Sequence, residues 1–198
     1  MIDSLVELDK RLFLALNELH APWLDPIMYW VSDTVIWLPL YAFLLYHVAK
    51  LPRSRAMIAV VCIAAGITMS DQLSSKLIRP RIQRPRPTWD VQVSSQVHTV
   101  NEYRGGHFGF PSSHAANTFC AAVLIMLLLR KPWTAWLLAW ALLVSYSRIY
   151  LGVHYPGDIL AGALLGSCCA LTAFMLYKTG SRITQKLTDK KATDKGAP

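Results

Sequence analysis

Residues Ile159 to Tyr177 read Ile-Leu-Ala-Gly-Ala-Leu-Leu-Gly-Ser-Cys-Cys-Ala-Leu-Thr-Ala-Phe-Met-Leu-Tyr and contain no charged side chain. A helix of ~20 apolar residues is long enough to cross the ~30 Å hydrocarbon layer of a bilayer, so this stretch predicts a membrane span. The blocks Arg55 to Ile78 and Trp133 to Val153 have a similar length and composition. Two shorter apolar blocks, Val35 to Ala49 and His114 to Leu129, are also expected to span.

The composition of the whole chain agrees with a membrane protein, because 54% of its residues are hydrophobic and only 16% are charged. Residues 3–19 place leucines at helical spacing around a charged centre, which favours an interfacial helix over a span. The predicted fold is therefore all-α, a polytopic membrane helical bundle of about five to six membrane helices. It forms one domain over residues 1–178, with N-terminal interfacial helices in 1–32 and a basic cytoplasmic tail over 179–198.

Short loops rich in lysine and arginine mark the cytoplasmic side of a membrane protein. Such residues occur at 50–55, at 130–131 and in the C-terminal tail, which fall on one side in a five-span arrangement. The segment 79–113 then forms an outer loop, on the periplasmic side of a bacterial inner membrane. Because its first part is itself rich in arginine, against the usual charge distribution, this loop is expected to bind something anionic.

Arginine and proline dominate the start of the outer loop, in the stretch Arg79-Pro80-Arg81-Ile82-Gln83-Arg84-Pro85-Arg86-Pro87. A guanidinium group stays charged and presents a fork of donors that matches phosphate oxygens. The prolines stiffen the backbone around these donors. Taken alone, the stretch fits a phosphate site and a basic patch for anionic headgroups equally well.

A second polar stretch, Phe110-Pro111-Ser112-Ser113-His114, stands directly before an apolar block. Serine is a favoured N-cap, and the unpaired N–H groups and positive dipole of a helix N-terminus form a seat for phosphate. A histidine at that position can give a proton to a leaving oxygen. The alternative is an ordinary capped helix with a solvated histidine.

The third stretch runs from Ser147 to Asp158. Arg148 lies at the end of an apolar block, where an unpaired charge is costly, so it should face the protein interior or an anionic ligand. His154 and Asp158 are four residues apart around a Pro-Gly turn. The carboxylate can therefore accept a hydrogen bond from one ring nitrogen and leave the other nitrogen free to attack. The alternative is a structural His-Asp pair that caps a helix.

Together these stretches resemble the signature of the type-2 phosphatidic-acid phosphatase family, which includes lipid phosphate phosphatases, bacterial polyprenyl-pyrophosphate phosphatases and soluble vanadium haloperoxidases. The resemblance covers roughly residues 70–166. Its most specific element, Ser-Arg, five residues, His, three residues and Asp, is found at Ser147, Arg148, His154 and Asp158. In the second element, Ser113 stands where the family usually has glycine, and the backbone N–H is kept.

The first element of the family is usually a lysine, six residues and Arg-Pro. With Arg86-Pro87 as its end, this spacing places Arg79 in the lysine position. Lys76 with Arg84-Pro85 gives a competing register, with seven residues between them. We favour Arg79 with Arg86, because this pair keeps the family spacing.

The resemblance implies that His154 attacks phosphorus to form a phosphohistidine, that Asp158 orients it, and that His114 protonates the leaving oxygen. It also implies the ligands of the phosphoryl oxygens, which are Arg79, Arg86, Arg148, Ser112 and the N–H of Ser113. No metal ion or other cofactor is expected, because the arginines make Mg²⁺ unnecessary and no carboxylate cluster suited to it is visible.

The predicted function is hydrolysis of a lipid phosphate or pyrophosphate by an integral membrane phosphatase, with undecaprenyl pyrophosphate as the first choice of substrate. Phosphatidylglycerol phosphate, phosphatidic acid and a lipid A-like glycolipid are alternative substrates. A non-catalytic protein that binds or transports anionic lipids is the alternative of another class, and the histidines disfavour it. The expected partners are the lipid substrate and the bilayer, and no nucleic acid is expected. The sequence does not predict the oligomeric state. Asp71 and Gln72 are expected to be interior packing contacts.

Overall fold

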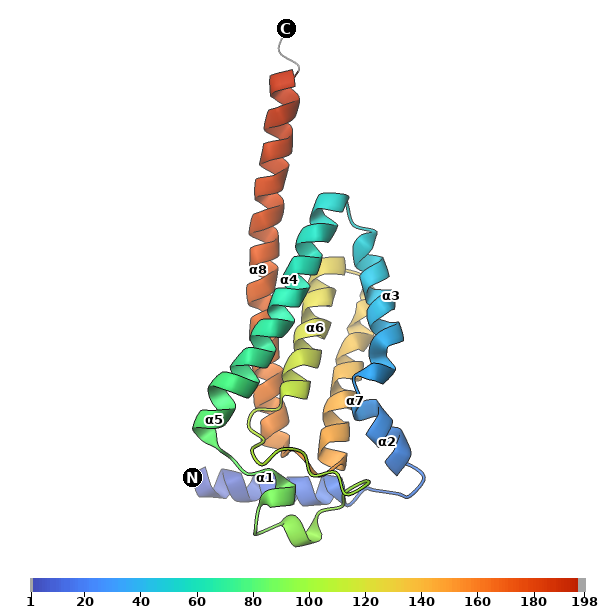
Figure 1. Ribbon diagram of the computed structural model, residues 1–198, viewed down its shortest axis with the longest axis vertical. Helices are drawn as coiled ribbons and strands as arrows, with labels where there is room; N and C mark the ends of the chain where they lie inside the picture. Colours follow the sequence, from blue (N-terminus) through green and yellow to red (C-terminus); the bar gives the residue numbers. More distant parts are fainter. Residues whose placement is uncertain (1, 196–198) are drawn as a thin grey trace.

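The protein is a bundle of helices that run alternately up and down (Figure 1). A computed structural model describes the backbone of residues 2–195 and the side chains of residues 3–187. The predicted all-α fold is confirmed, and extended pairing within these residues is limited to one isolated bridge between Pro85 and Phe108. The α-helices are α1 Ile2–Asn17, α2 Asp25–Ser32, α3 Leu38–Ala49, α4 Arg53–Gln72, α5 Arg79–Ile82, α6 Ser113–Leu129, α7 Trp136–Tyr150 and α8 Pro156–Lys195.

Helices α6 and α8 pack against each other through small residues. A Cβ atom at Gly162 would overlap the backbone oxygen of Ser112, and one at Gly166 would overlap that of Ala116. Glycine is therefore required at both positions for the two backbones to approach so closely, as is common between helices in membranes. The contact also brings the N-terminus of α6 beside the N-terminus of α8, where Ser112 N donates to Asp158 O over 3.0 Å.

Fewer helices have the length and composition of a membrane span than the sequence predicts. Among the described residues, the stretches Arg53–Ile82 and Pro156–Leu187 are long and apolar enough to cross a bilayer. Helix α2 and residues Val35–Ala49 form a bent pair, at 73°, that passes the same test together. Helix α6 has 17 residues and α7 has 15. A count of two to three spans is thus supported, and the count of about five to six stays a prediction.

The expected span Trp133 to Val153 is shorter in the structure than in the sequence. Its first turn is a 3₁₀ helix, Pro132–Ala135, and α7 follows to Tyr150. The helix ends because Gly152 adopts a φ of +74°, which glycine reaches without the strain other residues would suffer. The chain turns back there and starts α8 at Pro156, so residues 151–155 form a tight connection at the end of the bundle.

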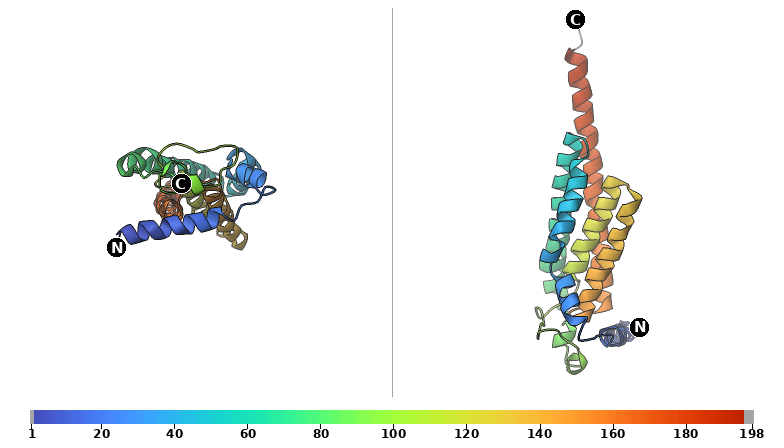
Figure 2. Two further views of the ribbon diagram at one scale, coloured as in Figure 1. Left: turned by 90° about the horizontal axis from the view of Figure 1, so that it is seen from below. Right: turned by 90° about the vertical axis from the view of Figure 1, so that its right-hand side faces the viewer.

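Helix α1 lies across the lower end of the bundle, nearly perpendicular to the other helices (Figures 1 and 2). Phe13 and Asn17 on one face are buried, and Leu5 and Leu8 are exposed. Asn17 Nδ2 donates to backbone oxygens at the end of α7, including that of Tyr150 at 2.9 Å. This arrangement is suited to a helix that lies in the membrane interface, and the interfacial assignment stays a prediction.

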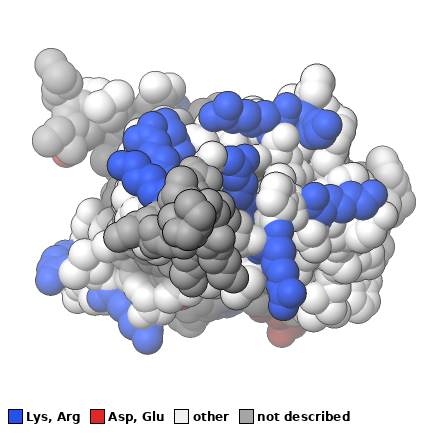
Figure 3. All heavy atoms as spheres, turned by 90° about the horizontal axis from the view of Figure 1, so that it is seen from above, with Lys and Arg blue, Asp and Glu red and all other residues white. Residues whose placement is uncertain are grey.

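Lysine and arginine side chains gather at the upper end of the bundle, opposite α1 (Figure 3). The loop 50–52 and the turn 130–131 lie at this end, as the sequence predicts for one side of the membrane. Helix α8 passes through this end and continues without a break to Lys195, so the expected tail from 179 begins within a helix. The last residues of that tail, 196–198, lie outside the described residues.

Candidate active site

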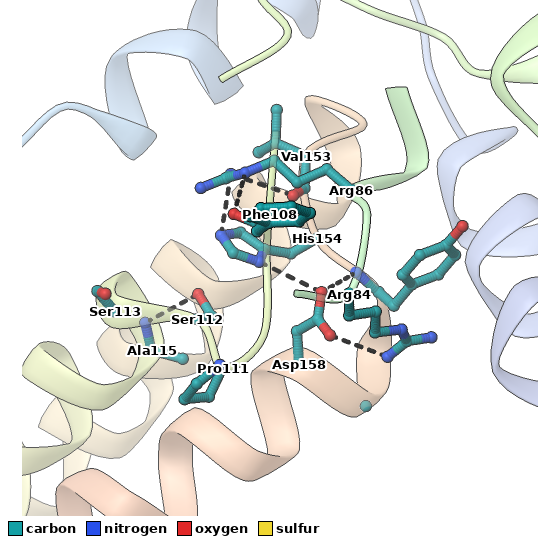
Figure 4. A network of polar contacts seen from close by, with 12 residues as sticks. Arg84, Arg86, Phe108, Pro111, Ser112, Ser113, Ala115, Val153, His154 and Asp158 are labelled. Carbon is teal, nitrogen blue, oxygen red and sulfur yellow. Dashed lines mark hydrogen bonds and ion pairs between the residues drawn. The ribbon is translucent and has the colours of Figure 1, made fainter. Parts of the chain in front are cut away.

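The three polar stretches meet at the lower end of the bundle, although they are far apart in the sequence (Figure 4). The first follows α4 through a π-helical turn, Leu73–Ile78, and the short helix α5. The second begins α6, and the third joins α7 to α8. π-Helical turns occur often at functional sites.

His154 and Asp158 are both buried, with 1% and 0% of their surface exposed. His154 Nδ1 lies 3.4 Å from Asp158 Oδ2, which also accepts a hydrogen bond from Tyr155 N at 3.0 Å. His154 Nε2 points the other way and lies 3.2 Å from Arg86 Nη1. The carboxylate therefore faces one ring nitrogen and a cation faces the other, which fixes the orientation of the imidazole.

Asp158 has a second ionic partner that the sequence did not reveal. Arg84 Nη1 donates to Asp158 Oδ1 at 2.9 Å, and Arg84 Nη2 donates to Asp9 Oδ2 at 2.7 Å. Asp9 Oδ1 also accepts a hydrogen bond from Gly157 N at 2.8 Å. The competing register considers Arg84 only as a phosphate ligand, and Asp9 lies in an amphipathic helix among other charged residues, with no local signal of this contact.

Arg86 is held beside His154 by backbone oxygens. Arg86 Nε donates to Phe108 O and Nη1 to Val153 O, each over 3.1 Å. Gly109 lies against this group, since a Cβ atom there would come within 3.0 Å of Arg86 Cγ and 3.1 Å of Asp158 Oδ2. The glycine-rich segment before α6 therefore allows the loop to close over the histidine and arginine.

Arg79 reaches the start of α6, whereas Lys76 does not. Arg79 Nη2 donates to Ser113 Oγ at 2.6 Å and to Pro111 O at 3.1 Å. Its Nε is buried and has no protein partner. Lys76 is exposed on the outside of the π-helical turn. The geometry brings Arg79 and Arg86 to the site in the favoured register.

Ser112 and Ser113 take different places at this helix start. Ser112 is fully buried, and its Oγ accepts a hydrogen bond from Ala115 N, as expected of an N-cap. Ser113 Oγ accepts hydrogen bonds from Arg79 and, at 2.9 Å, from Ser74 Oγ. Of the two side chains, Ser113 faces the arginines and Ser112 serves the helix.

Arg148 lies in the interior, as its place in an apolar block predicts, with 4% of its surface exposed. Its guanidinium donates to Ser32 Oγ and, at 3.2 Å, to Tyr103 Oη. Its Nε is buried without a partner. Ser32 and Tyr103 are further site residues that no sequence pattern marked, because each is an isolated polar residue in a region of mixed composition.

The arginines strongly shape the electrostatics of the site. Burial, together with the nearby charges of Arg148 and Arg79, lowers the pKa of Arg86 to about 10. Burial and the charges of Arg86, Arg148 and Arg79 hold the pKa of His154 well below its usual value. Arg86 is thus still charged at neutral pH, and His154 is neutral there with an available lone pair. A cluster of unneutralised cations favours a bound anion.

His114 lies where two cavities meet. A polar cavity of about 200 Å³ extends from His114 and Arg148 toward Tyr29 and Asp33. An apolar cavity of about 430 Å³ extends from His114 between α3, α4, α6 and α7 into the bundle. Ser32, Thr34 and His114 line both cavities. The site therefore joins a polar space at the end of the bundle to an apolar space within it.

The polar residues Asp71 and Gln72 at the end of α4 do not behave alike. Gln72 is exposed on the outside of the bundle, so the expectation that it packs in the interior is wrong. Asp71 lines the apolar cavity. Within the described residues no group of three His, Cys, Asp or Glu side chains has the arrangement of a metal site.

Comparison with known proteins identifies the family. A model of the PAP2 superfamily matches residues 55–182. A lipid A 4'-phosphatase of Bacteroides thetaiotaomicron is 39% identical, over 100% of this chain and 88% of the relative. An undecaprenyl-diphosphatase of Sulfolobus acidocaldarius is 31% identical, over 86% of this chain and 79% of the relative. The crystal structure of Aquifex aeolicus LpxE is similar with a TM-score of 0.61 and 25% identity, over 83% of this chain and 93% of that chain.

The matched region spans all three polar stretches, which confirms the resemblance found in the sequence. The chain therefore belongs to the PAP2 superfamily, and it is a membrane lipid phosphatase whose reaction needs no metal ion.

Proposed function

We propose that this phosphatase removes a phosphate group from a phosphorylated glycolipid of the lipid A type. The observation that carries the proposal is the 39% identity, over the whole chain, to a lipid A 4'-phosphatase. Undecaprenyl pyrophosphate, the substrate favoured from the sequence, becomes the alternative substrate. The undecaprenyl-diphosphatase relative is 31% identical to this chain and covers less of it than the lipid A 4'-phosphatase does. The polar cavity has room for part of a sugar headgroup and the apolar cavity for acyl chain.

The reaction begins with His154 as the nucleophile. Its Nε2 carries the lone pair, because Nδ1 faces Asp158 and keeps the proton there. Nε2 attacks phosphorus, the bond between phosphorus and the sugar oxygen breaks, and a phosphohistidine forms. Asp158 stabilises the positive charge that develops on the ring, and Arg84 holds the second oxygen of Asp158 in place.

His114 acts as the general acid and then as the general base. It gives its proton to the leaving sugar oxygen, which departs as a hydroxyl group. His114 then takes a proton from a water molecule whose oxygen attacks the phosphohistidine, and the bond between phosphorus and Nε2 breaks to release inorganic phosphate. Such help is typically worth ~10²–10⁴-fold in rate, and it matters less when the leaving group is good.

The phosphoryl oxygens are held by Arg79, Arg86 and Arg148, together with the N–H of Ser113. Support comes from the buried Nε atoms of Arg79 and Arg148, which have no protein partner. It also comes from Arg86, whose Nη1 lies 3.2 Å from the attacking nitrogen. Ser112 contributes by capping α6, so that the first N–H groups of the helix point at the phosphate.

The site faces the periplasmic side of a bacterial inner membrane. The charge distribution supports this orientation, since the basic residues within 50–55 and at 130–131 lie at the end of the bundle opposite the site. A phosphatase of lipid headgroups on this side has access to its substrate from the membrane, through the apolar cavity that lies between the helices.

A phosphate-release assay with purified protein in EDTA tests the proposal. The panel holds a phosphorylated glucosamine lipid, undecaprenyl pyrophosphate, phosphatidic acid and phosphatidylglycerol phosphate, each in the same detergent. We expect the glycolipid to have the highest kcat/KM. A higher kcat/KM for undecaprenyl pyrophosphate would contradict the proposal and identify that lipid as the preferred substrate.

A further inference from the structure

The apolar cavity contains polar groups about one helical turn into the bundle from the site. Asn117 is four residues after Ser113 on α6, which is about 6 Å along the helix. Asp71 lies opposite on α4, one turn before Ser74, and Ser74 contacts Ser113. Asp71 and Asn117 both line the cavity, among side chains that are mostly apolar. The phosphate end of the site is therefore followed by a polar pair and then by hydrocarbon.

The pair has unused capacity to accept hydrogen bonds. Asn117 Nδ2 donates to Asp71 Oδ1 over a long distance, 3.4 Å, and Gln72 Nε2 approaches Asp71 Oδ2 at 3.5 Å. Asn117 Oδ1 is buried and has no partner. A carboxylate can accept about four hydrogen bonds and an amide oxygen two. Apart from the second N–H of Asn117 Nδ2, the free positions are acceptors, so the group that satisfies them carries a hydrogen-bond donor.

A second polar atom without a protein partner belongs to Trp140, which lines the same cavity deeper in the bundle. Trp140 is 3% exposed, and its Nε1 is buried and unpaired. Trp140 is eight residues before Arg148 on α7, which is about 12 Å along the helix. An indole N–H can only donate, so the group that satisfies it is a hydrogen-bond acceptor. The Asp71–Asn117 pair and the deeper Trp140 thus suit a lipid chain that carries both a hydrogen-bond donor and an acceptor, as a hydroxylated or amide-linked acyl chain does.

We propose that Asp71 and Asn117 select lipids whose chain carries a hydroxyl or amide N–H about one helical turn from the phosphorylated end. The inference rests on the proposed function, because it assumes that the cavity receives the lipid part of the substrate. A donor that meets Asn117 Oδ1 or Asp71 removes the cost of leaving these acceptors buried and unpaired. An isoprenoid chain is hydrocarbon at this level and leaves them unpaired, so the pair disfavours it.

The test compares two synthetic glycolipids with the same sugar, phosphate and chain length. One has amide-linked hydroxyacyl chains, and the other has ester-linked chains without the hydroxyl group. The wild-type protein should prefer the first by about tenfold in kcat/KM, which corresponds to one or two hydrogen bonds. Asn117→Leu should bring this ratio close to one. Trp140→Phe, which keeps the ring and removes the N–H, should lower the ratio in part.

Thr172→Leu serves as the matched control, because Thr172 is exposed on α8 and its hydroxyl donates only to Cys168 O. This variant should keep the wild-type ratio, and melting temperatures in detergent identify any variant that fails to fold. Equal rates of the wild type on both lipids, or an unchanged ratio in folded Asn117→Leu and Trp140→Phe, would overturn the inference and leave the proposed function standing. Hydrolysis of neither glycolipid, with phosphate released from undecaprenyl pyrophosphate, would overturn both.

Discussion

Arg84 joins α1 to the site, since its guanidinium donates hydrogen bonds to Asp158 Oδ1 at 2.9 Å and to Asp9 Oδ2 at 2.7 Å. Asp158 has no exposed surface, so the ion pair with Arg84 is what makes its charge tolerable at that position. Arg84 also stacks over the ring of Tyr155, with 4.1 Å from its central carbon to the ring centroid. Arg84 is therefore a positioning residue, and it acts on His154 through Asp158.

Arg84→Ala should lower kcat far more than it changes KM, because His154 loses its orientation while the phosphate ligands remain. The loss of a partner for a buried charge costs about 3 kcal/mol in stability, and the partial exposure of Arg84 places the cost at the lower end of the usual range. Arg84→Lys should restore part of both. Arg81→Ala is the control, since Arg81 is exposed and bonds only to Leu77 O. A similar loss in Arg81→Ala, or a change confined to KM in Arg84→Ala, would contradict this role.

Arg79→Ala should lose about ten- to a hundredfold in kcat/KM, because a hydrogen bond to a charged group contributes ~1.5–3 kcal/mol. Arg79→Lys should recover part of that loss, as the family usually has lysine there. Lys76→Ala should be mild, because Lys76 is exposed and lies away from α6. If Lys76→Ala is instead as damaging as Arg86→Ala and Arg79→Ala is nearly silent, the register is wrong.

A cysteine at Val91 should react with a membrane-impermeant thiol reagent added to spheroplasts. Val91 is 93% exposed and lies in the segment that we assign to the periplasmic side. Ser54→Cys, at an exposed position in the first turn of α4 at the other end of the bundle, is the control and should react only with a permeant reagent. Both changes need a background without the native thiols, which are Cys62, Cys120, Cys168 and Cys169. The opposite labelling pattern would invert the orientation.

The stability of the protein should fall on acidification, in part because of His154. Burial and the nearby arginines depress its pKa in the folded state. The unfolded chain therefore binds a proton below pH ~6.5 that the folded chain does not, and stability is lost as pH falls through that value. His154→Gln should show a smaller drop in melting temperature between pH 7.5 and 5.0 than the wild type, with both pH values chosen to bracket about 6.5. An equal drop in the two proteins would show that His154 is not held neutral.

Much of the fold follows from the sequence, because apolar blocks have few alternatives to membrane or core helices. The blocks around α4, α6 and α8 correspond to helices in the structure. The helix lengths were harder to predict. Gly152 ends α7 early through its positive φ, and α8 runs on through the basic segment where the composition suggested a boundary.

The grouping of His154, Asp158, His114 and Arg148 was predictable, since their spacing places them at helix ends that meet. The contact from Asp9 to Arg84 was not, because it joins residues 75 positions apart, one in α1 and one in the loop after α5, whose packing no local pattern encodes. Arg84 and Arg86 are the same residue type, each followed by proline, and only the fold separates them. One turns to the carboxylate of Asp158 and the other to the imidazole of His154.

Trapping the phosphoenzyme tests whether His154 is the nucleophile. The protein is mixed with a lipid substrate that carries ³²P in its phosphate, quenched rapidly in alkali, and digested for peptide mapping. We expect a label that is stable to alkali and labile to acid on the peptide that contains His154 in the wild type, and no such label in His154→Ala. With a good leaving group, His114→Ala should still form this label and should hydrolyse it slowly. A label on another residue, or turnover by His154→Ala at a substantial rate, would contradict the account.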